Sequence, residues 1–308
     1  MADAGKTVHI PVLLAGVLAQ LGDLKNKKIV DGTFGGGGYS TAFLEAGAHV
    51  LAIDRDTVAL ERGKKIQEKY QGKLSLSHGS FADLNEILKK NGWDGADAIV
   101  LDLGISSDQL DTAERGFGYQ NDGPLDMRMG NTGSTAANIL ATASEHELAS
   151  IFKNYGDEPK AKPLAKKIVQ QRKEQPVTTT REFLELIEQV YPPRQGLNRR
   201  HPAQRIFQAL RIAVNDELKA VEEVVPQAIE NLNVGGKFCV VTFHSLEDRF
   251  IKNAMRDICQ SELDNVGRLV KQANFRQPVK KVVPTQEEVE NNPRARSATL
   301  RVLERVSS

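Results

Sequence analysis

An alternation of strand-like and helix-like segments over residues 28–103 constrains the fold of this chain most strongly. Short β-branched runs at 28–31 and 49–53 alternate with segments of helical apolar spacing such as 57–70. Residues 98–103 form a continuous apolar run, as expected of a strand inside a parallel sheet. Strands and helices that alternate over short links predict an α/β fold with a doubly wound sheet and right-handed crossovers.

The alternation stops after residue 106, and helical patterns separated by loops rich in Gly, Pro and Asp follow. Strand character returns only beyond residue 236. The simplest interpretation is one α/β domain, residues 1–106 and 215–308, interrupted by an inserted helical domain, residues 107–214, that recognises the substrate. The polar segment 272–292 has no regular pattern and is predicted to be a loop or flap.

Positive charge is concentrated in the predicted insertion. Residues 160–211 hold 12 basic and 4 acidic residues, a net charge of +8, whereas the whole chain has a net charge of +1. The near-neutral total excludes a globally basic nucleic-acid binder. The block itself has the electrostatic signature of a polyanion partner, although a solvated helix face would give the same count.

Composition excludes several other classes of protein. The only cysteines, Cys239 and Cys259, are too few for a disulfide scaffold or a Cys-rich zinc site, and they suit a reducing cytoplasm. No H-E-x-x-H or C-x-x-C motif is present, so no metal is expected. No apolar run approaches the ~20 residues of a membrane helix, and no secretory signal is recognisable. We therefore expect a cytoplasmic protein that does not enter membranes.

A glycine-rich loop and a later carboxylate predict a nucleoside site. The sequence DGTFGGGGY (residues 31–39) follows the first predicted strand and opens the first helix. Glycines let a backbone approach a ligand closely, and a helix N-terminus offers free N–H donors. Asp54 ends the second predicted strand, where a carboxylate can accept hydrogen bonds from both hydroxyls of a ribose.

Two cofactors fit this pattern, and Asp31 separates them. A dinucleotide loop, G-x-G-x-x-G, would need its third glycine at Ser40. A carboxylate at Asp31, just before the loop, suits the ammonium group of an amino acid and repels a pyrophosphate. These residues favour S-adenosylmethionine over NAD, and a nicotinamide-dependent oxidoreductase is the rival interpretation.

Eight segments together resemble the MraW/RsmH family of ribosomal RNA methyltransferases. They are DGTFGGGGYS (31–40), AIDRD (52–56), LDLGISSDQL (101–110), AERGF (113–117), DGPLDMRM (122–129), HPAQRIFQA (201–209), TFHSLEDR (242–249) and NPRARS (292–297). They extend over almost the whole chain, and DGPLDMRM and TFHSLEDR are the most specific. The resemblance implies a methyltransferase-type α/β domain with an inserted helical domain. It also implies methylation of the N4 amino group of a cytosine in small-subunit (16S) ribosomal RNA.

The resemblance also implies the residues that bind S-adenosylmethionine: Gly37, Gly38, Tyr39, Asp54, Phe81, Asp102 and Gln109. Tyr39 departs from the family, which usually has His at this position, so this chain has no imidazole there. Phe81 follows the third predicted strand, where its ring could lie against adenine or belong to the core.

Asp102 is the candidate catalytic residue. It ends the fourth predicted strand, and an acceptor there could orient the amino group of cytosine and stabilise its developing positive charge. Asp102 could equally serve the cofactor, and no single general base is assigned. The candidate substrate-binding residues are Arg115, Asp126, Arg128, Arg199, Arg200, His201, Arg205 and His244. Of these, Asp126 and Arg128 could simply form a salt bridge with each other, and His244 could be a helix cap.

The expected partner is ribosomal RNA or the small ribosomal subunit, and the oligomeric state is left open. A base has to leave its stack to reach a cofactor, so a single-stranded or loop target is favoured. A second rival function is a non-catalytic RNA-binding or assembly factor on a methyltransferase scaffold. Such a protein should have lost the glycine loop or Asp54, and this chain retains both.

Overall fold

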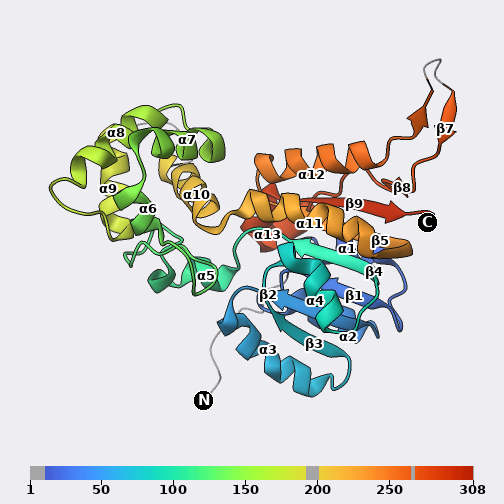
Figure 1. Ribbon diagram of the computed structural model, residues 1–308. Helices are drawn as coiled ribbons and strands as arrows, with labels where there is room; N and C mark the ends of the chain where they lie inside the picture. Colours follow the sequence, from blue (N-terminus) through green and yellow to red (C-terminus); the bar gives the residue numbers. More distant parts are fainter. Residues whose placement is uncertain (1–10, 192–200, 265–267, 308) are drawn as a thin grey trace. The chain divides into compact units, whose positions relative to one another are not determined.

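The computed structural model describes residues 11–191, 201–264 and 268–307, and the chain divides into two compact units (Figure 1). Unit 1 comprises Met1–Gly104 and Lys219–Ser308, and unit 2 comprises Ile105–Leu218. The bounds of the predicted insertion, 107–214, differ from those of unit 2 by only a few residues. Among the residues that the structure describes, no helix combines the length and the apolar character needed to cross a membrane.

A seven-stranded sheet in the order β3-β2-β1-β4-β5-β9-β8 forms the centre of unit 1. Its strands are β1 (Lys28–Asp31), β2 (His49–Asp54), β3 (Leu74–His78), β4 (Ala96–Asp102), β5 (Leu232–Thr242), β8 (Phe275–Arg276) and β9 (Thr299–Arg305). Strands β1 to β5 are parallel, whereas β9 and β8 join the sheet in antiparallel pairs. The predicted doubly wound α/β sheet is confirmed.

Helices cover both faces of this sheet. One face carries α1 (Leu14–Leu21), α2 (Gly38–Glu45) and α3 (Thr57–Lys69), and the other carries α4 (Leu84–Lys90), α11 (Glu217–Asn231) and α12 (Ser245–Ile258). Within β4, Val100 packs on the first face and Ile99 and Leu101 on the second. Because both faces are buried, residues 98–101 of the strand are continuously apolar, as the sequence pattern indicates.

The strand order reverses direction between β1 and β4, which lie side by side at the centre of the sheet. In open α/β sheets, ligands bind outside the carboxyl ends of the strands at such a point. The antiparallel β9 begins at this same edge, because Thr299 pairs with Thr242, the last residue of β5. The carboxyl edge of the sheet is therefore formed by the ends of β1 to β5 and by the segment that precedes β9.

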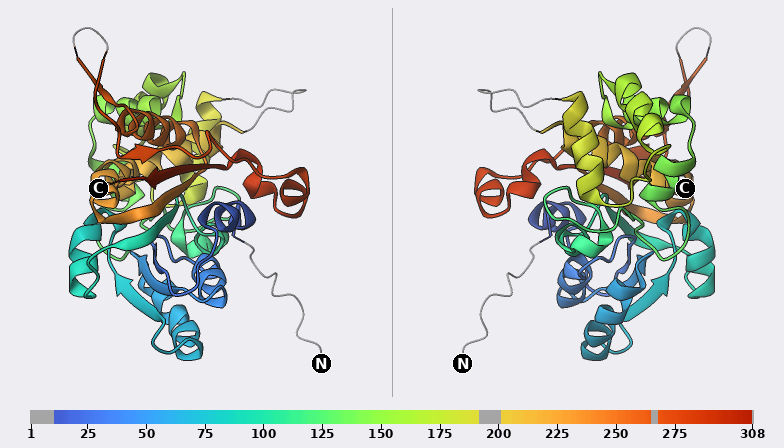
Figure 2. Two further views of the ribbon diagram at one scale, coloured as in Figure 1. Left: turned by 90° about the vertical axis from the view of Figure 1, so that its right-hand side faces the viewer. Right: turned by 90° about the vertical axis from the view of Figure 1, so that its left-hand side faces the viewer.

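The prediction of a loop over residues 272–292 is wrong in part. The segment contains β8 and the helix α13 (Gln286–Asn291), which projects beside α1 (Figure 2). The α13 helix begins at Thr285, whose side chain accepts a hydrogen bond from the Glu288 N–H. This Thr-x-x-Glu pattern is a helix-start signal that could have predicted α13. Strand β8 has two residues and depends on its pairing with β9, so local sequence could not show it.

Unit 2 is helical. Its helices are α5 (Ser107–Asp111), η2 (Ala113–Arg115), α6 (Ala136–Thr142), α7 (Glu145–Gly156), α8 (Ala161–Gln171), α9 (Thr180–Val190) and α10 (Pro202–Asn215). They share one core, to which α10 contributes Ile206, Phe207 and Leu210. The AERGF and DGPLDMRM segments pack backbone against backbone, since a Cβ at Gly116 would lie 2.1 Å from the carbonyl oxygen of Pro124. These two motifs therefore depend on each other for their conformation.

Candidate cofactor and base site

Three carboxylates end three neighbouring strands at the carboxyl edge of the unit 1 sheet. Asp31 is the last residue of β1, Asp54 of β2 and Asp102 of β4. Asp31 lies in register with Ala52 of β2 and Val100 of β4, so the three strand ends are close together. This edge is where the sequence predicts the cofactor.

Asp31 fastens both ends of the glycine loop. It is only 1% exposed, and its Oδ1 accepts a hydrogen bond from the Thr33 N–H at 3.2 Å. Its Oδ2 accepts one from the Ser40 hydroxyl, in α2, at 2.6 Å. Burial, with a smaller contribution from the charge of Asp54, raises the pKa of Asp31 to about 6, although the hydrogen bonds from Ser40 and Thr33 act in the opposite direction. Both oxygens thus have partners within the chain, and the predicted contact with an ammonium group stays a prediction.

The loop glycines are required partly for packing. Gly37 has φ +78°, and a Cβ there would lie 2.6 Å from the Ile66 side chain, while a Cβ at Gly38 would lie 2.3 Å from Pro11. At Gly36 a Cβ would meet nothing within 4 Å. Gly37 and Gly38 therefore offer a ligand only their backbone, at the start of α2, where N–H groups lack helical partners.

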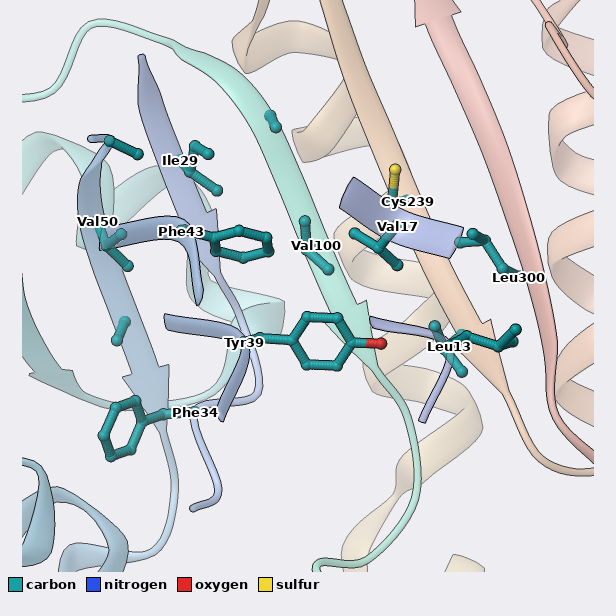
Figure 3. Close-up of a cluster of buried hydrophobic side chains, with 14 of the residues drawn as sticks. Leu13, Val17, Ile29, Phe34, Tyr39, Phe43, Val50, Val100, Cys239 and Leu300 are labelled. Carbon is teal, nitrogen blue, oxygen red and sulfur yellow. The ribbon is translucent and has the colours of Figure 1, made fainter. Parts of the chain in front are cut away.

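The side chain of Tyr39 belongs to the hydrophobic core. It is 4% exposed, its ring lies 5.9 Å from that of Phe43, and its hydroxyl donates a hydrogen bond to the Val12 carbonyl. Figure 3 shows the Tyr39 ring between Phe43 and Leu13. The predicted cofactor contact at Tyr39 would thus involve its backbone, and it stays a prediction.

Asp54 holds the loop from the other side. Its Oδ2 accepts a hydrogen bond from the Gly35 N–H at 2.7 Å, and its Oδ1 accepts one from the Asp56 N–H at 2.8 Å. Burial raises the pKa of Asp54. An ionised carboxylate has about four acceptor sites, so each oxygen retains capacity for one hydroxyl of a ribose.

Phe81 begins a short 3-10 helix, η1 (Phe81–Asp83), directly after β3. The Ser80 side chain caps this turn and also accepts a hydrogen bond from Arg55 at 2.7 Å. A Cβ at Gly32 would lie 3.3 Å from the Cβ of Phe81, so the turn lies close to the start of the glycine loop. Phe81 packs partly against the core, and its predicted contact with adenine stays a prediction.

Asp102 carries a buried oxygen without a partner. Its Oδ1 is buried and has no hydrogen-bond partner among the residues that the structure describes. Its backbone N–H donates to the Thr33 hydroxyl at 2.7 Å, which sequence reasoning did not anticipate. Burial holds the pKa of Asp102 well above its usual range, and the charges of Asp31 and Glu247 raise it further. A buried orphan acceptor of this kind indicates a position for a ligand.

His244 caps α12, as one of its two interpretations from the sequence predicted. Its second ring nitrogen, Nε2, is not used by the cap. Its Nδ1 accepts a hydrogen bond from the Glu247 N–H at 3.4 Å. Its Nε2 lies 3.0 Å from Glu247 Oε1, a contact that becomes an ion pair when the ring is protonated, and no described residue forms a hydrogen bond with Nε2. Because Nδ1 accepts, Nε2 carries the proton in the neutral ring. His244 therefore presents an unused donor.

Glu247 fixes the segment between β5 and α12. It is 1% exposed, and its Oε2 accepts hydrogen bonds from the N–H groups of Phe243 at 3.0 Å and His244 at 3.3 Å. Val241 of β5 lies in register with Asp102 of β4. Two buried polar atoms have no hydrogen-bond partner among the described residues: Asp102 Oδ1 and His244 Nε2. Asp102 ends β4 and His244 lies just after the neighbouring strand β5, so both residues lie at the same edge of the sheet.

In unit 2, several predicted contacts already have partners inside the protein. Arg115 donates to the carbonyl oxygens of Arg128 and Met129, each at 3.0 Å. Asp126 and Arg128 form a two-pronged salt bridge with N···O distances of 2.8 and 2.7 Å. Gln109 forms a reciprocal capping box with Ser106. These contacts order the AERGF and DGPLDMRM segments, and binding of cofactor or substrate by these residues stays a prediction.

The candidates at α10 also have structural roles. His201 caps the helix through its Nδ1, and its ring stacks on Tyr119 with 5.6 Å between ring centroids. Arg205 pairs with the buried Glu158 at 2.8 Å. Arg199 and Arg200 lie outside the described residues.

Unpaired positive charge in unit 2 lies elsewhere. An open groove of about 430 Å³ between α8 and α9 is lined by Lys160, Pro163, Lys166, Lys167, Gln170, Gln189 and Val190. Lys160 donates to the Val190 carbonyl at 2.8 Å, whereas Lys166 and Lys167 have no ion-pair partner in the described part of the chain. The charge count predicted a basic block, but it did not single out these lysines.

Comparison with known proteins shows the family of the chain. The sequence profile of the MraW methylase family matches residues 6–306. The ribosomal RNA small subunit methyltransferase H of Rhizobium meliloti is 45% identical over 97% of this chain and 88% of its own length. The protein of the same name from Thermomicrobium roseum is 44% identical over 100% of this chain and 96% of its own.

A solved rRNA methylase from Streptococcus thermophilus aligns with 99% of this chain and 100% of its own, at 11% identity and a TM-score of 0.42.

The donor set at the sheet edge suits a cationic nucleoside. Buried carboxylates with raised pKa values favour a positively charged ligand, and a pyrophosphate would add negative charge among them. S-adenosylmethionine carries a sulfonium and an ammonium group and no phosphate. The match over nearly the full length confirms this cofactor and removes the nicotinamide rival. From its profile, its relatives and this edge of its sheet, the chain belongs to the MraW methylase family.

Proposed function

We propose that this enzyme methylates the N4 amino group of a cytosine in small-subunit (16S) ribosomal RNA, with S-adenosylmethionine as methyl donor. The observation that carries the proposal is the buried, unpartnered Oδ1 of Asp102 at the end of β4. The relatives' names, which specify small-subunit ribosomal RNA, support the substrate.

In this proposal the residues of unit 1 bind and orient the cofactor. The backbone N–H groups of Gly37, Gly38 and Tyr39 face its methionine part, Asp54 accepts the ribose hydroxyls, and Phe81 lies against adenine. When bound, the cofactor supplies a methyl group made electrophilic by its sulfonium. Its positive charge also favours the ionised form of the acidic groups at the edge.

Asp102 orients the base for in-line transfer. The N4 lone pair of cytosine is delocalised into the ring, so N4 is a weak nucleophile until its amino group is turned. Asp102 Oδ1 accepts a hydrogen bond from N4, directs the lone pair and stabilises the positive charge that develops there. Acting from β4, which is fixed on both faces, Asp102 needs no reorganisation during the reaction.

His244 contributes to the choice of base. The cytosine edge presents a donor at N4 and acceptors at N3 and O2. Asp102 provides an acceptor and His244 Nε2 provides a donor, and they follow adjacent strands. Uracil has an acceptor in place of N4, so it would leave Asp102 Oδ1 unpaired and is rejected.

The direct test is mass spectrometry of nucleosides from small-subunit ribosomal RNA. RNA from cells that lack the enzyme should contain no N4-methylcytidine at the target site, and addition of the purified protein with S-adenosylmethionine should restore it. A protein that binds the RNA and leaves its nucleosides unchanged would support the rival, a non-catalytic assembly factor.

Substitution Asp102→Asn should lower turnover more than cofactor affinity. The amide keeps one acceptor oxygen and loses the charge that stabilises N4. Loss of one preorganised partner typically lowers the rate by about 10²–10³-fold. Single-turnover rates at saturating cofactor, together with the Kd for S-adenosylmethionine, measure the two effects separately.

Asp97→Asn is a matched control, because Asp97 lies at the amino end of the same strand and accepts a hydrogen bond from the Lys28 N–H. It should leave single-turnover rates unchanged. A rise in the Kd with normal saturated turnover in Asp102→Asn would instead assign Asp102 to cofactor binding alone.

Cofactor affinity should rise with pH between about 5 and 7. Asp31, with its pKa of about 6, is partly protonated in the free protein over this range, and burial raises the pKa of Asp102 in the same direction. A cation favours their ionised forms, so binding releases protons and is stronger at higher pH. The range lies below about 8, where the amino group of the cofactor would lose its own proton.

Isothermal titration calorimetry in buffers of different ionisation enthalpy measures this proton release directly. Asp31→Asn should reduce both the release and the pH dependence. An affinity that is constant from pH 5 to 7 would show that these carboxylates do not sense the charge of the cofactor.

We further propose that the groove between α8 and α9 contacts RNA phosphates. The double substitution Lys166→Gln and Lys167→Gln should weaken RNA binding and flatten its salt dependence by about 0.7 unit of logarithmic slope for each phosphate that the variant no longer binds. Lys153→Gln, on the exposed surface of α7, is the control. A slope equal to that of the wild type would mean that the groove is only solvated.

A further inference from the structure

The NPRARS motif lies at the functional edge of the unit 1 sheet. It contains the 3-10 helix η3 (Pro293–Ser297), which directly precedes β9. Because β9 begins opposite the end of β5, and β5 ends beside Asp102, two strand spacings separate the start of β9 from Asp102. At about 4.8 Å per spacing, this is roughly 10 Å.

The motif is held in a fixed conformation. Ala295 and Ala298 are buried in the same core cluster as Tyr39, at 0% and 2% exposure. The Asn292 side chain accepts a hydrogen bond from the Arg294 N–H at 3.2 Å and caps the turn. The buried alanines anchor the turn on the sheet, so Arg296, between them in the sequence, is presented at the surface.

The side chain of Arg296 takes no part in the polar contacts that stabilise the described fold. It is exposed, and it forms no hydrogen bond or ion pair with any described residue. Two other exposed arginines of this unit are paired: Arg256 with Asp257 at 2.8 Å, and Arg276 with Glu304 at 3.0 Å. Arg249 and Arg268 are exposed and, like Arg296, have no side-chain partner among the described residues. What sets Arg296 apart is its place in a capped turn, anchored by buried alanines, at the edge where the target base must arrive.

We infer that Arg296 binds a phosphate of the RNA strand next to the target nucleotide. This inference rests on the proposed function. A base that leaves its stack to reach Asp102 brings its flanking phosphates to the same edge, and a guanidinium binds phosphate with two parallel hydrogen bonds. Phosphate contacts position the strand without reading its sequence. The turn thus gives unit 1 a phosphate-binding residue of its own, in addition to the basic groove in unit 2.

The test compares Arg296→Gln with Arg276→Gln. Arg276 is a suitable control because it is also exposed but belongs to β8. Its partner Glu304 lies opposite Lys237, five residues before the end of β5 and away from the functional edge. The probes are small ribosomal subunits and naked small-subunit RNA from cells that lack the enzyme, and S-adenosylmethionine alone. Circular dichroism and thermal unfolding confirm that both variants fold.

Arg296→Gln should raise the Kd for RNA and flatten the dependence of log Kd on log salt concentration by about 0.7 unit, the value for one phosphate contact to a single strand. Its Kd for S-adenosylmethionine should equal that of the wild type, and Arg276→Gln should change neither quantity.

Three results would overturn the inference. An unchanged RNA slope would show that Arg296 touches no phosphate. Weaker binding of S-adenosylmethionine would assign Arg296 to the carboxylate of the cofactor. A defect with ribosomal subunits and none with naked RNA would assign it to a protein partner. These results differ from failure of the proposed function, in which the wild-type protein itself would methylate no RNA.

Discussion

The removal of three carboxyl groups from water at one edge of the sheet is the constraint on which the site depends. Asp31, Asp54 and Asp102 end adjacent strands of a sheet whose faces are both covered, so none of them is fully solvated. Backbone N–H groups of the glycine loop offset part of this cost at Asp31 and Asp54. Asp102 Oδ1 receives no such compensation within the described chain. The loop conformation, the raised pKa values and the preference for a cationic ligand all follow from this arrangement.

The sheet and its functional edge could be predicted from sequence because they depend on local pattern. Alternating segments give the strands, and a carboxylate that directly follows an apolar run lies at the carboxyl end. The reasons for individual loop residues could not be predicted. Side chains at Gly37 and Gly38 would clash with Ile66 and Pro11, and the Tyr39 side chain packs into the core. These contacts join segments that are separated in the sequence, so local pattern does not reveal them.

The charged candidate residues show a different limit of prediction from sequence. A count of charges identifies a basic block but does not say which side chains are already used. Arg115 binds two carbonyl oxygens and Arg205 binds a buried glutamate, so each has a structural role that its sequence motif does not reveal. Lys166 and Arg296 stand out only after the partners of the other basic residues are known. Unpaired charge is a property of the folded chain.

The antiparallel strand β9 has a consequence for folding in the cell. It is synthesised after the other strands of its sheet, and until it pairs with β5, that strand is an open edge with the buried run Phe238–Val241 beside unsatisfied backbone groups. Exposed apolar edge strands recruit other chains and start aggregation. A chain that lacks β9 would therefore be prone to aggregate and not merely inactive. Quality control by chaperones and proteases would meet that species before any defect in methylation appeared.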